Sequence, residues 1–262
     1  NRDDRPVTRM TGGVHLGLIG FDEHHMGSSV SNPESDGLSL LASKLQELGH
    51  EVERIEAELP VNDALPWDVL VLPFPKLQFS TGEMVALHEH LRSGNSLLLL
   101  TEWGDLYSHV DHLNELTAPY GIHIQKDRVT DLEDHVSHEV KLGGVVLDEQ
   151  PMPHYVRIRN FSEHPITEGL SELIYFSGCS LKTSEPAVTI ASTEATSFGD
   201  LDLDIELDDD EEQGNLTIAA ASEMEGRMLV VGDSNIAANG YVEQGDNLAF
   251  ILQTIEWLLR AR

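Results

Sequence analysis

Three segments of the chain hold polar side chains of the types that bind ligands or move protons. Residues 21–27 (FDEHHMG), 101–105 (TEWGD) and 232–234 (GDS) each follow an apolar run. Because ligand groups gather at the carboxyl ends of the strands in open α/β sheets, we expect one pocket to draw on all three segments. The predicted ligand-binding residues are Asp22, His24, His25, Glu102, Trp103, Asp233 and Ser234.

Residues 101–105 lie where hydrolases and amidotransferases of this architecture carry their nucleophile, at a sharp turn between a strand and a helix. Acyl transfer there uses a serine or cysteine, but this turn offers only Glu102 and Trp103. The single cysteine, Cys179, has no such turn around it and is expected to be a small buried side chain. We therefore predict no catalytic residues and favour a binding protein over an enzyme.

A metal-assisted hydrolase is the alternative that the same residues leave open. Asp22, His24 and His25 would supply ligands, together with His109 or Asp105 from the following helix. Activation of water needs three protein ligands and one open position on the metal. The first three residues lack a spacing typical of a metal site, so a polar loop is the simpler interpretation and no cofactor is predicted.

The first half of the chain alternates apolar runs with amphipathic segments. Ser80 and Glu83 form a capping box at the start of one helix, and Gly94 follows its end. Buried runs between amphipathic helices predict a parallel sheet covered by helices. Strands are predicted at residues 15–20, 51–55, 68–73, 96–101 and 121–124, and helices at residues 37–48, 81–92 and 105–116.

The second half is richer in strands. Residues 126–153 mix His, Asp and Gly, and we predict an irregular insertion there. With no clear linker, we predict one α/β domain over residues 14–260, preceded by a flexible segment, residues 1–13. Strands are predicted at residues 154–159, 173–176, 187–192, 216–221 and 228–232, and a last helix at residues 247–259.

Residues 200–212 hold nine acids in 13 positions and alternate acidic with apolar residues as far as Leu207. This alternation predicts an edge strand with a solvated acidic face, on which neighbouring carboxylates are about 7 Å apart. The alternative is a Ca²⁺ site that uses residues 208–212, although the glycine that an EF-hand loop needs at its turn is absent.

The composition is strongly acidic, with 46 Asp and Glu against 16 Lys and Arg and a net charge of −30 in 262 residues. This charge excludes general nucleic-acid binding, because a phosphate backbone needs basic side chains. Dispersed acids with few lysines are typical of a halophile, whose concentrated salt screens the repulsion. A specialised acidic protein with a cationic partner is the rival interpretation.

One cysteine and no long apolar stretch predict a cytoplasmic protein without membrane insertion in this segment. Whether the protein forms a homo-oligomer stays open.

Several further segments occur in an order that resembles a known family. They are residues 163–170 (EHPITEGL), 174–181 (IYFSGCSL), 186–193 (PAVTIAST), 226–234 (GRMLVVGDS) and 255–258 (IEWL), with residues 68–72 (DVLVL) and 93–96 (SGNS) in the first half. Together they resemble the GIFT-type domain, a class I glutamine amidotransferase-like domain of intraflagellar-transport and gliding-motility transporter components. The resemblance covers residues 14–260.

This resemblance implies an α/β fold, a three-layer flavodoxin-like sandwich with a mostly parallel central sheet and a β-rich second half. It also implies the catalytically inactive branch, which lacks the Cys-His-Glu triad, so no catalytic residue is carried over. The implied function is a non-catalytic ligand- or protein-binding domain of a transporter-associated or other multi-protein assembly. The implied partner is a protein or a small molecule such as a sugar.

Overall fold

The computed structural model describes residues 10–11, 14–142 and 145–260. The predicted flexible segment, residues 1–13, therefore lies outside the described residues except for Met10–Thr11 (β1). This short strand pairs antiparallel with Val14–His15 (β2).

Five neighbouring parallel strands form one side of a ten-stranded sheet, in the order β4-β3-β5-β6-β17, with β4 at the edge of the sheet. Because all five run in one direction, their carboxyl ends lie along one edge, called here the carboxyl edge. The strands are β3 (Leu18–Asp22), β4 (Glu51–Ile55), β5 (Val69–Pro73), β6 (Ser96–Leu100) and β17 (Arg227–Val231).

Antiparallel strands extend the sheet beyond β17, which confirms the predicted β-rich second half. β16 pairs with β17 and leads through β14 to β11, while β13 bridges β16 and β7. These strands are β16 (Thr217–Glu223), β14 (Val188–Ser192), β11 (Asn160–Phe161), β13 (Leu181–Thr183) and β7 (Ile122–Ile124).

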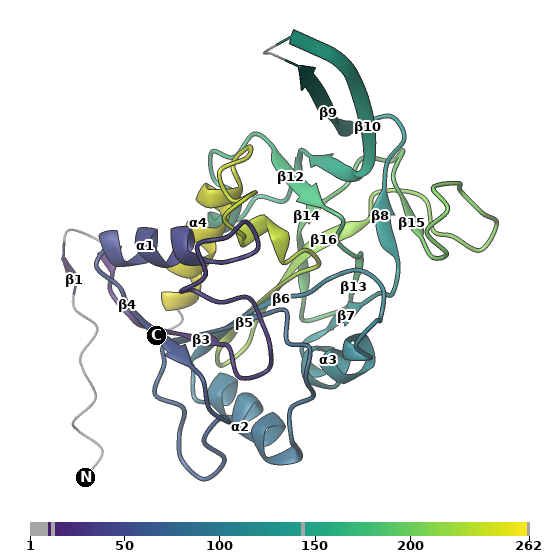
Figure 1. Ribbon diagram of the computed structural model, residues 1–262. Helices are drawn as coiled ribbons and strands as arrows, with labels where there is room; N and C mark the ends of the chain where they lie inside the picture. Colours follow the sequence, from purple (N-terminus) through teal and green to yellow (C-terminus); the bar gives the residue numbers. More distant parts are fainter. Residues whose placement is uncertain (1–9, 12–13, 143–144, 261–262) are drawn as a thin grey trace.

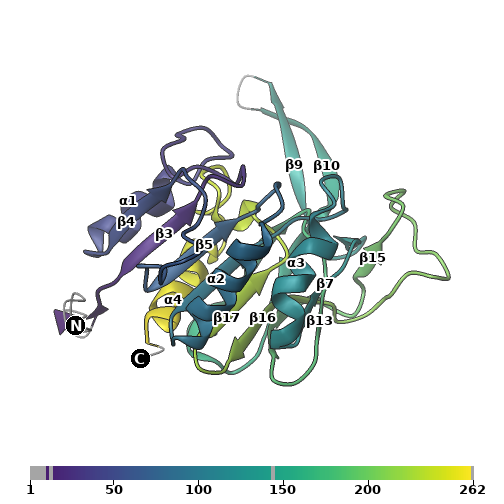
Figure 2. The ribbon, with the colours of Figure 1, turned by 90° about the horizontal axis from the view of Figure 1, so that it is seen from below.

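Helices cover both faces of the parallel strands, as Figures 1 and 2 show. Leu98 and Leu100 of β6 belong to the core shared with α1 and α4, whereas Leu97 and Leu99 belong to the core under α2 and α3. Successive side chains of a strand point to opposite faces, so a continuous apolar run such as residues 97–100 fills both cores. The helices are α1 (Ser39–Glu47), α2 (Thr81–Arg92), α3 (His109–Thr117) and α4 (Asn247–Leu259).

The predicted capping box of α2 is confirmed. Ser80 Oγ accepts a hydrogen bond from the Glu83 backbone N–H, and Glu83 Oε2 accepts one from the Ser80 N–H at 2.8 Å. Gly94 follows the helix with a φ of +81°, in the left-handed region that favours glycine.

The prediction of an irregular insertion at residues 126–153 is wrong. The segment contains β8 (Arg128–Thr130), β9 (His135–Leu142) and most of β10 (Val145–Ile158). β9 and β10 pair antiparallel as a long hairpin that projects from the body in Figure 1, and β10 also pairs with β12 (Leu173–Phe176). The register shifts at two places, one of which includes Pro153, and these shifts break the alternation on which strand prediction depends.

The predicted edge strand over residues 200–207 is also wrong. β15 (Phe198–Asp200) pairs with β8 and ends at Asp200. Leu203 and Ile205 then have φ values of +71° and +69°, which no strand accommodates. Asp200 Oδ1 accepts the Leu203 N–H, and Asp204 Oδ1 accepts the Glu206 N–H. These local hydrogen bonds replace those of a strand ladder, so the segment forms a loop.

Candidate functional site

Two buried carboxylates follow β6 and β17 at the carboxyl edge. Glu102 Oε1 accepts hydrogen bonds from Ser234 Oγ at 2.6 Å, from Asn235 Nδ2 at 2.9 Å and from the Ser234 N–H at 3.3 Å. Asp233 accepts the Phe176 N–H at 2.6 Å and the Asn235 N–H at 2.8 Å. Three predicted residues, Glu102, Asp233 and Ser234, therefore lie in one network, together with Asn235, which is not among the predicted ligand-binding residues.

Burial dominates the protonation of this carboxylate pair. It raises the pKa of Glu102 from 4.5 to about 7, although the Ser234 hydrogen bonds and the Lys76 charge act in the opposite direction. Burial also raises the pKa of Asp233 well above its ordinary value, and the Glu102 charge adds to this effect. Because two close carboxylates away from water resist double ionisation, the pair retains a proton near neutral pH.

A second buried group follows β3. His25 Nδ1 lies 2.8 Å from Asp22 Oδ2, and His25 Nε2 lies 3.4 Å from Glu83 Oε1. Burial lowers the His25 pKa, but the Asp22 hydrogen bond and the charges of Asp22 and Glu83 outweigh it and raise the pKa above 6.5. Glu83 also accepts the Leu59 N–H at 3.0 Å, so this group joins three segments of the chain. Glu83 is the member that was predicted only as a helix cap.

The predicted pocket residues thus form two groups, with the loop after β5 beside the second. In that loop the Lys76 N–H donates to the His25 carbonyl at 2.8 Å. His24 is half-buried, with its ring centre 5.0 Å from that of His25. Trp103 is half-buried against the core, and the Arg128 guanidinium carbon lies 5.6 Å from its ring centre. The contacts described above for Trp103 and for His24 are therefore with different residues, and the two side chains do not line one common site.

The contacts of the histidines bear on the metal-site alternative. Both His25 nitrogens face carboxylates, as described above. His109 Nε2 donates to the Glu102 carbonyl at 3.2 Å, and Asp105 binds Lys126 Nζ at 2.8 Å. These side chains are therefore engaged within the protein, and the geometry gives no support to a metal bound at the His24 loop.

Within the described part of the chain, one cluster has three potential ligand atoms within 4.8 Å of one another: Asp200, Asp202 and Asp204. Asp200 is fully buried and binds Arg128 Nη2 at 2.7 Å, while the other two are exposed. Desolvation and the charges of Asp204 and Asp202 raise the pKa of the exposed Asp208. Clustered acids alone do not define a cation site, so the Ca²⁺ alternative stays a prediction.

Exposed apolar side chains lie in the loops that follow β3, β5 and β6 at the carboxyl edge. Leu106 is 81% exposed and Tyr107 49%, in the loop after β6. Met26 and Leu77, after β3 and β5, are also exposed, and the Leu77 N–H donates to the carbonyl beside Met26, that of His25. We call the following residues the edge surface: Met26, Phe74, Lys76, Leu77, Leu106 and Tyr107.

Lys76 occupies the middle of the edge surface. Its Nζ lies 5.3 Å from the Phe74 ring centre and 5.7 Å from that of Tyr107. Among the lysines and arginines whose ion pairs the structure describes, each has a carboxylate within 4.0 Å, whereas Lys76, whose side chain is also described, has none. Sequence reasoning missed this surface because single Leu, Lys and Tyr residues in separate loops form no pattern.

Backbone geometry is unusual in the same loops. Met26 and Phe74 have φ values of +59° and +60°, and Ser108, which follows the loop after β6, has a φ of +51°. Non-glycine residues adopt this conformation at a cost of about 1–3 kcal/mol each, and such residues concentrate at functional sites. Glu102 and Trp103 are not among them, because Gly104 takes the positive φ of this turn, +68°.

A sequence model described as "Domain of unknown function (DUF4350)" matches residues 30–255. Among solved structures, the mmIFT52 N-terminal domain superposes with a TM-score of 0.70 at 18% identity, covering 92% of this chain and 97% of that one. A thua-like protein from Bacteroides uniformis ATCC 8492 gives 0.54 at 10% identity, covering 92% and 89%. Cytoplasmic Protein STM3548 from Salmonella typhimurium gives 0.54 at 13% identity, covering 93% and 99%.

No curated protein sequence matches the chain. At these identities the similar structures establish the fold alone. Among the described residues, no helix combines the length and the apolar character needed to cross a membrane.

Proposed function

Because the chain belongs to the DUF4350 family, a domain of unknown function, we propose its role from its geometry: a non-catalytic protein-binding domain of a multi-protein assembly. We propose in addition that its scaffold is flavodoxin-like and derives from the inactive branch of the amidotransferase-like proteins. The strand order β4-β3-β5-β6-β17 and the similarity to the mmIFT52 N-terminal domain support this scaffold.

The observation that carries the proposal is the burial and hydrogen bonding of Glu102. This residue occupies the turn at which enzymes of this architecture carry a nucleophile. Its Oε1 accepts three hydrogen bonds from Ser234 and Asn235, and the side chain is 8% exposed. A carboxylate whose Oε1 is buried and accepts three hydrogen bonds from the protein is held inward rather than presented as a nucleophile. The turn therefore serves to fix the loops after β6 and β17 against each other.

The edge surface is the binding site in this proposal. The chain leaves β3 and β5 toward opposite faces of the sheet, and such a switch point is where open α/β sheets bind ligands. Exposed Leu106 and Tyr107 offer apolar contact, and unpaired Lys76 offers a positive charge on a protein of net charge −30. The complementary partner is a protein segment that presents a carboxylate among apolar side chains.

A selection of random peptides against the full chain would test this proposal. We expect the enriched peptides to carry Asp or Glu beside apolar residues, and to bind Lys76→Ala and Leu106→Ala about tenfold or more weakly than wild type. Lys44→Ala and Leu40→Ala, at exposed positions of α1, are the matched controls. Equal affinity of the peptides for wild type and the edge-surface variants would refute the proposal.

A sugar ligand is the second kind of occupant that the sequence left open. For Trp103, the aromatic residue of the predicted pocket, the Arg128 guanidinium already lies over one face of the ring, which makes stacking of a sugar there less favourable. We therefore favour a protein partner at the carboxyl edge.

A further inference from the structure

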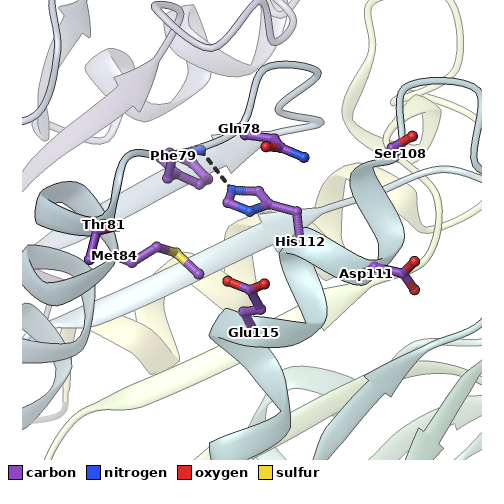
Figure 3. A pocket seen from close by; sticks show the side chains of 8 residues that line it. All are labelled: Gln78, Phe79, Thr81, Met84, Ser108, Asp111, His112 and Glu115. Atoms are coloured by element: carbon purple, nitrogen blue, oxygen red, sulfur yellow. Dashed lines mark hydrogen bonds between the residues drawn. The ribbon is translucent and has the colours of Figure 1, made fainter.

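A separate pocket of about 390 Å³ lies between the N-terminal part of α2 and α3. Figure 3 shows its side chains: Gln78, Phe79, Thr81, Met84, Ser108, Asp111, His112 and Glu115. Its volume is at the small end of the range for ligand sites, which suits one side chain better than a large cofactor.

The hydrogen bonding of His112 fixes one donor in this pocket. The Phe79 backbone N–H donates to His112 Nε2 at 2.7 Å. Since a backbone N–H can only donate, Nε2 carries a lone pair and the ring proton lies on Nδ1. Burial lowers the pKa of His112, which is consistent with a neutral ring. In Figure 3 the Nδ1 side of the ring faces Glu115, so the free N–H points into the pocket.

Two carboxylates stand one helical turn apart on the α3 side of the pocket. Glu115 has no hydrogen bond or ion pair to any described residue, whereas Asp111 binds Lys126 Nζ at 3.0 Å. No basic side chain lines the pocket, and buried Met84 and Phe79 supply apolar surface. The pocket thus combines negative charge, one neutral N–H donor and an apolar wall.

We propose that this pocket binds an arginine or lysine side chain of a partner protein. The aliphatic stem lies against Met84 and Phe79, and the cationic head donates to Glu115, with Asp111 adding its charge. The His112 Nδ1–H donates to a carbonyl of the partner's backbone. The pocket lies between α2 and α3 and shares no residue with the edge surface, so the inference does not depend on the proposed function.

Calorimetric titration with N-acetyl-arginine amide, which carries both a guanidinium and peptide carbonyls, tests the inference. We expect saturable binding that Glu115→Gln weakens about fivefold. Glu58→Gln removes the same charge from an exposed loop and should leave the affinity unchanged. Thr81→Arg places a guanidinium at the pocket itself and should abolish binding. Butylguanidinium, which has the same single positive charge and an aliphatic stem but no peptide carbonyl, should bind more weakly.

Three results would overturn the inference. The first is absence of saturable binding to wild type. The second is an equal loss of affinity in Glu115→Gln and Glu58→Gln, which would show attraction by the net charge alone. The third is equal binding of N-acetyl-glutamate amide. Lys76→Ala should not affect this titration, so failure here and failure of the edge-surface proposal are distinguishable.

Discussion

Replacing Glu102 with glutamine should stabilise the protein at neutral and alkaline pH. The folded-state pKa of Glu102 is about 7, against 4.5 in the unfolded chain. Below pH 4.5 both states are protonated, and the carboxyl behaves like the neutral amide. As the pH rises toward 7 the unfolded state loses its proton first, so the wild type becomes progressively less stable. The glutamine variant has no proton to lose.

The size of the effect follows from the two pKa values. At about 1.4 kcal/mol per pKa unit, the interval between 4.5 and about 7 corresponds to about 3 kcal/mol. A glutamine carbonyl can keep the hydrogen bonds from Ser234 Oγ and Asn235 Nδ2, so packing changes little. Removal of the Glu102 charge also eases ionisation of Asp233, whose pKa that charge raises.

Urea denaturation at constant high salt, followed by tryptophan fluorescence, measures the difference. The free energy of unfolding of Glu102→Gln minus that of wild type should rise between pH 4.5 and pH 7 and then level off. Glu58→Gln, at an exposed site, should show no such rise. A difference that does not vary with pH, or one that falls, would refute the assignment of a shared buried proton to this pair.

Four further outcomes are expected in denaturation experiments. His25→Ala should lower the free energy of unfolding by about 3–5 kcal/mol, because Asp22 and Glu83 lose their buried cation. Since the pKa of His25 is raised in the folded state, the stabilisation by His25 is full below pH 6.5 and declines as the pH passes the folded-state pKa. Ser80→Ala should cost about 1 kcal/mol through loss of the α2 cap, with unchanged circular dichroism at low temperature. With a net charge of −30, wild type should gain stability from dilute buffer to molar NaCl, and a flat response would instead favour a specific cationic partner. Ca²⁺ at constant ionic strength should stabilise wild type more than Asp202→Asn if the acidic loop binds it, and equal gains would exclude that alternative.

Local patterns predicted the elements whose determinants are local. The capping box at Ser80 and Glu83 and the apolar runs of β5 and β6 are properties of a few consecutive residues, and the structure has them. The β9–β10 hairpin depends on pairing between segments and on register shifts, which no short window contains. Residues 200–207 have a strand-like alternation, but after Asp200, the last residue of β15, they have no partner strand and form aspartate turns instead.

The candidate site was predictable only in part for a similar reason. Sequence order indicated that the loops after β3, β6 and β17 share one edge, because parallel strands require it. Sequence order did not indicate that Glu83, 58 positions after His25, would contact Nε2 of the His25 imidazole. That contact depends on how α2 packs on the sheet, and it turns a candidate ligand into a structural ion pair.

The carboxyl edge combines two features that each oppose stability. Glu102 and Asp233 are buried, which raises their pKa values and destabilises the fold when they ionise. Leu106 and Tyr107 are exposed, so the fold lacks the stabilisation of about 25 cal/mol that burial of each Å² of their apolar surface would contribute. In an enzyme of this architecture the polar groups would face the substrate. Here the same loops bury the polar groups and expose the apolar ones, an arrangement that supports the protein-binding role proposed above.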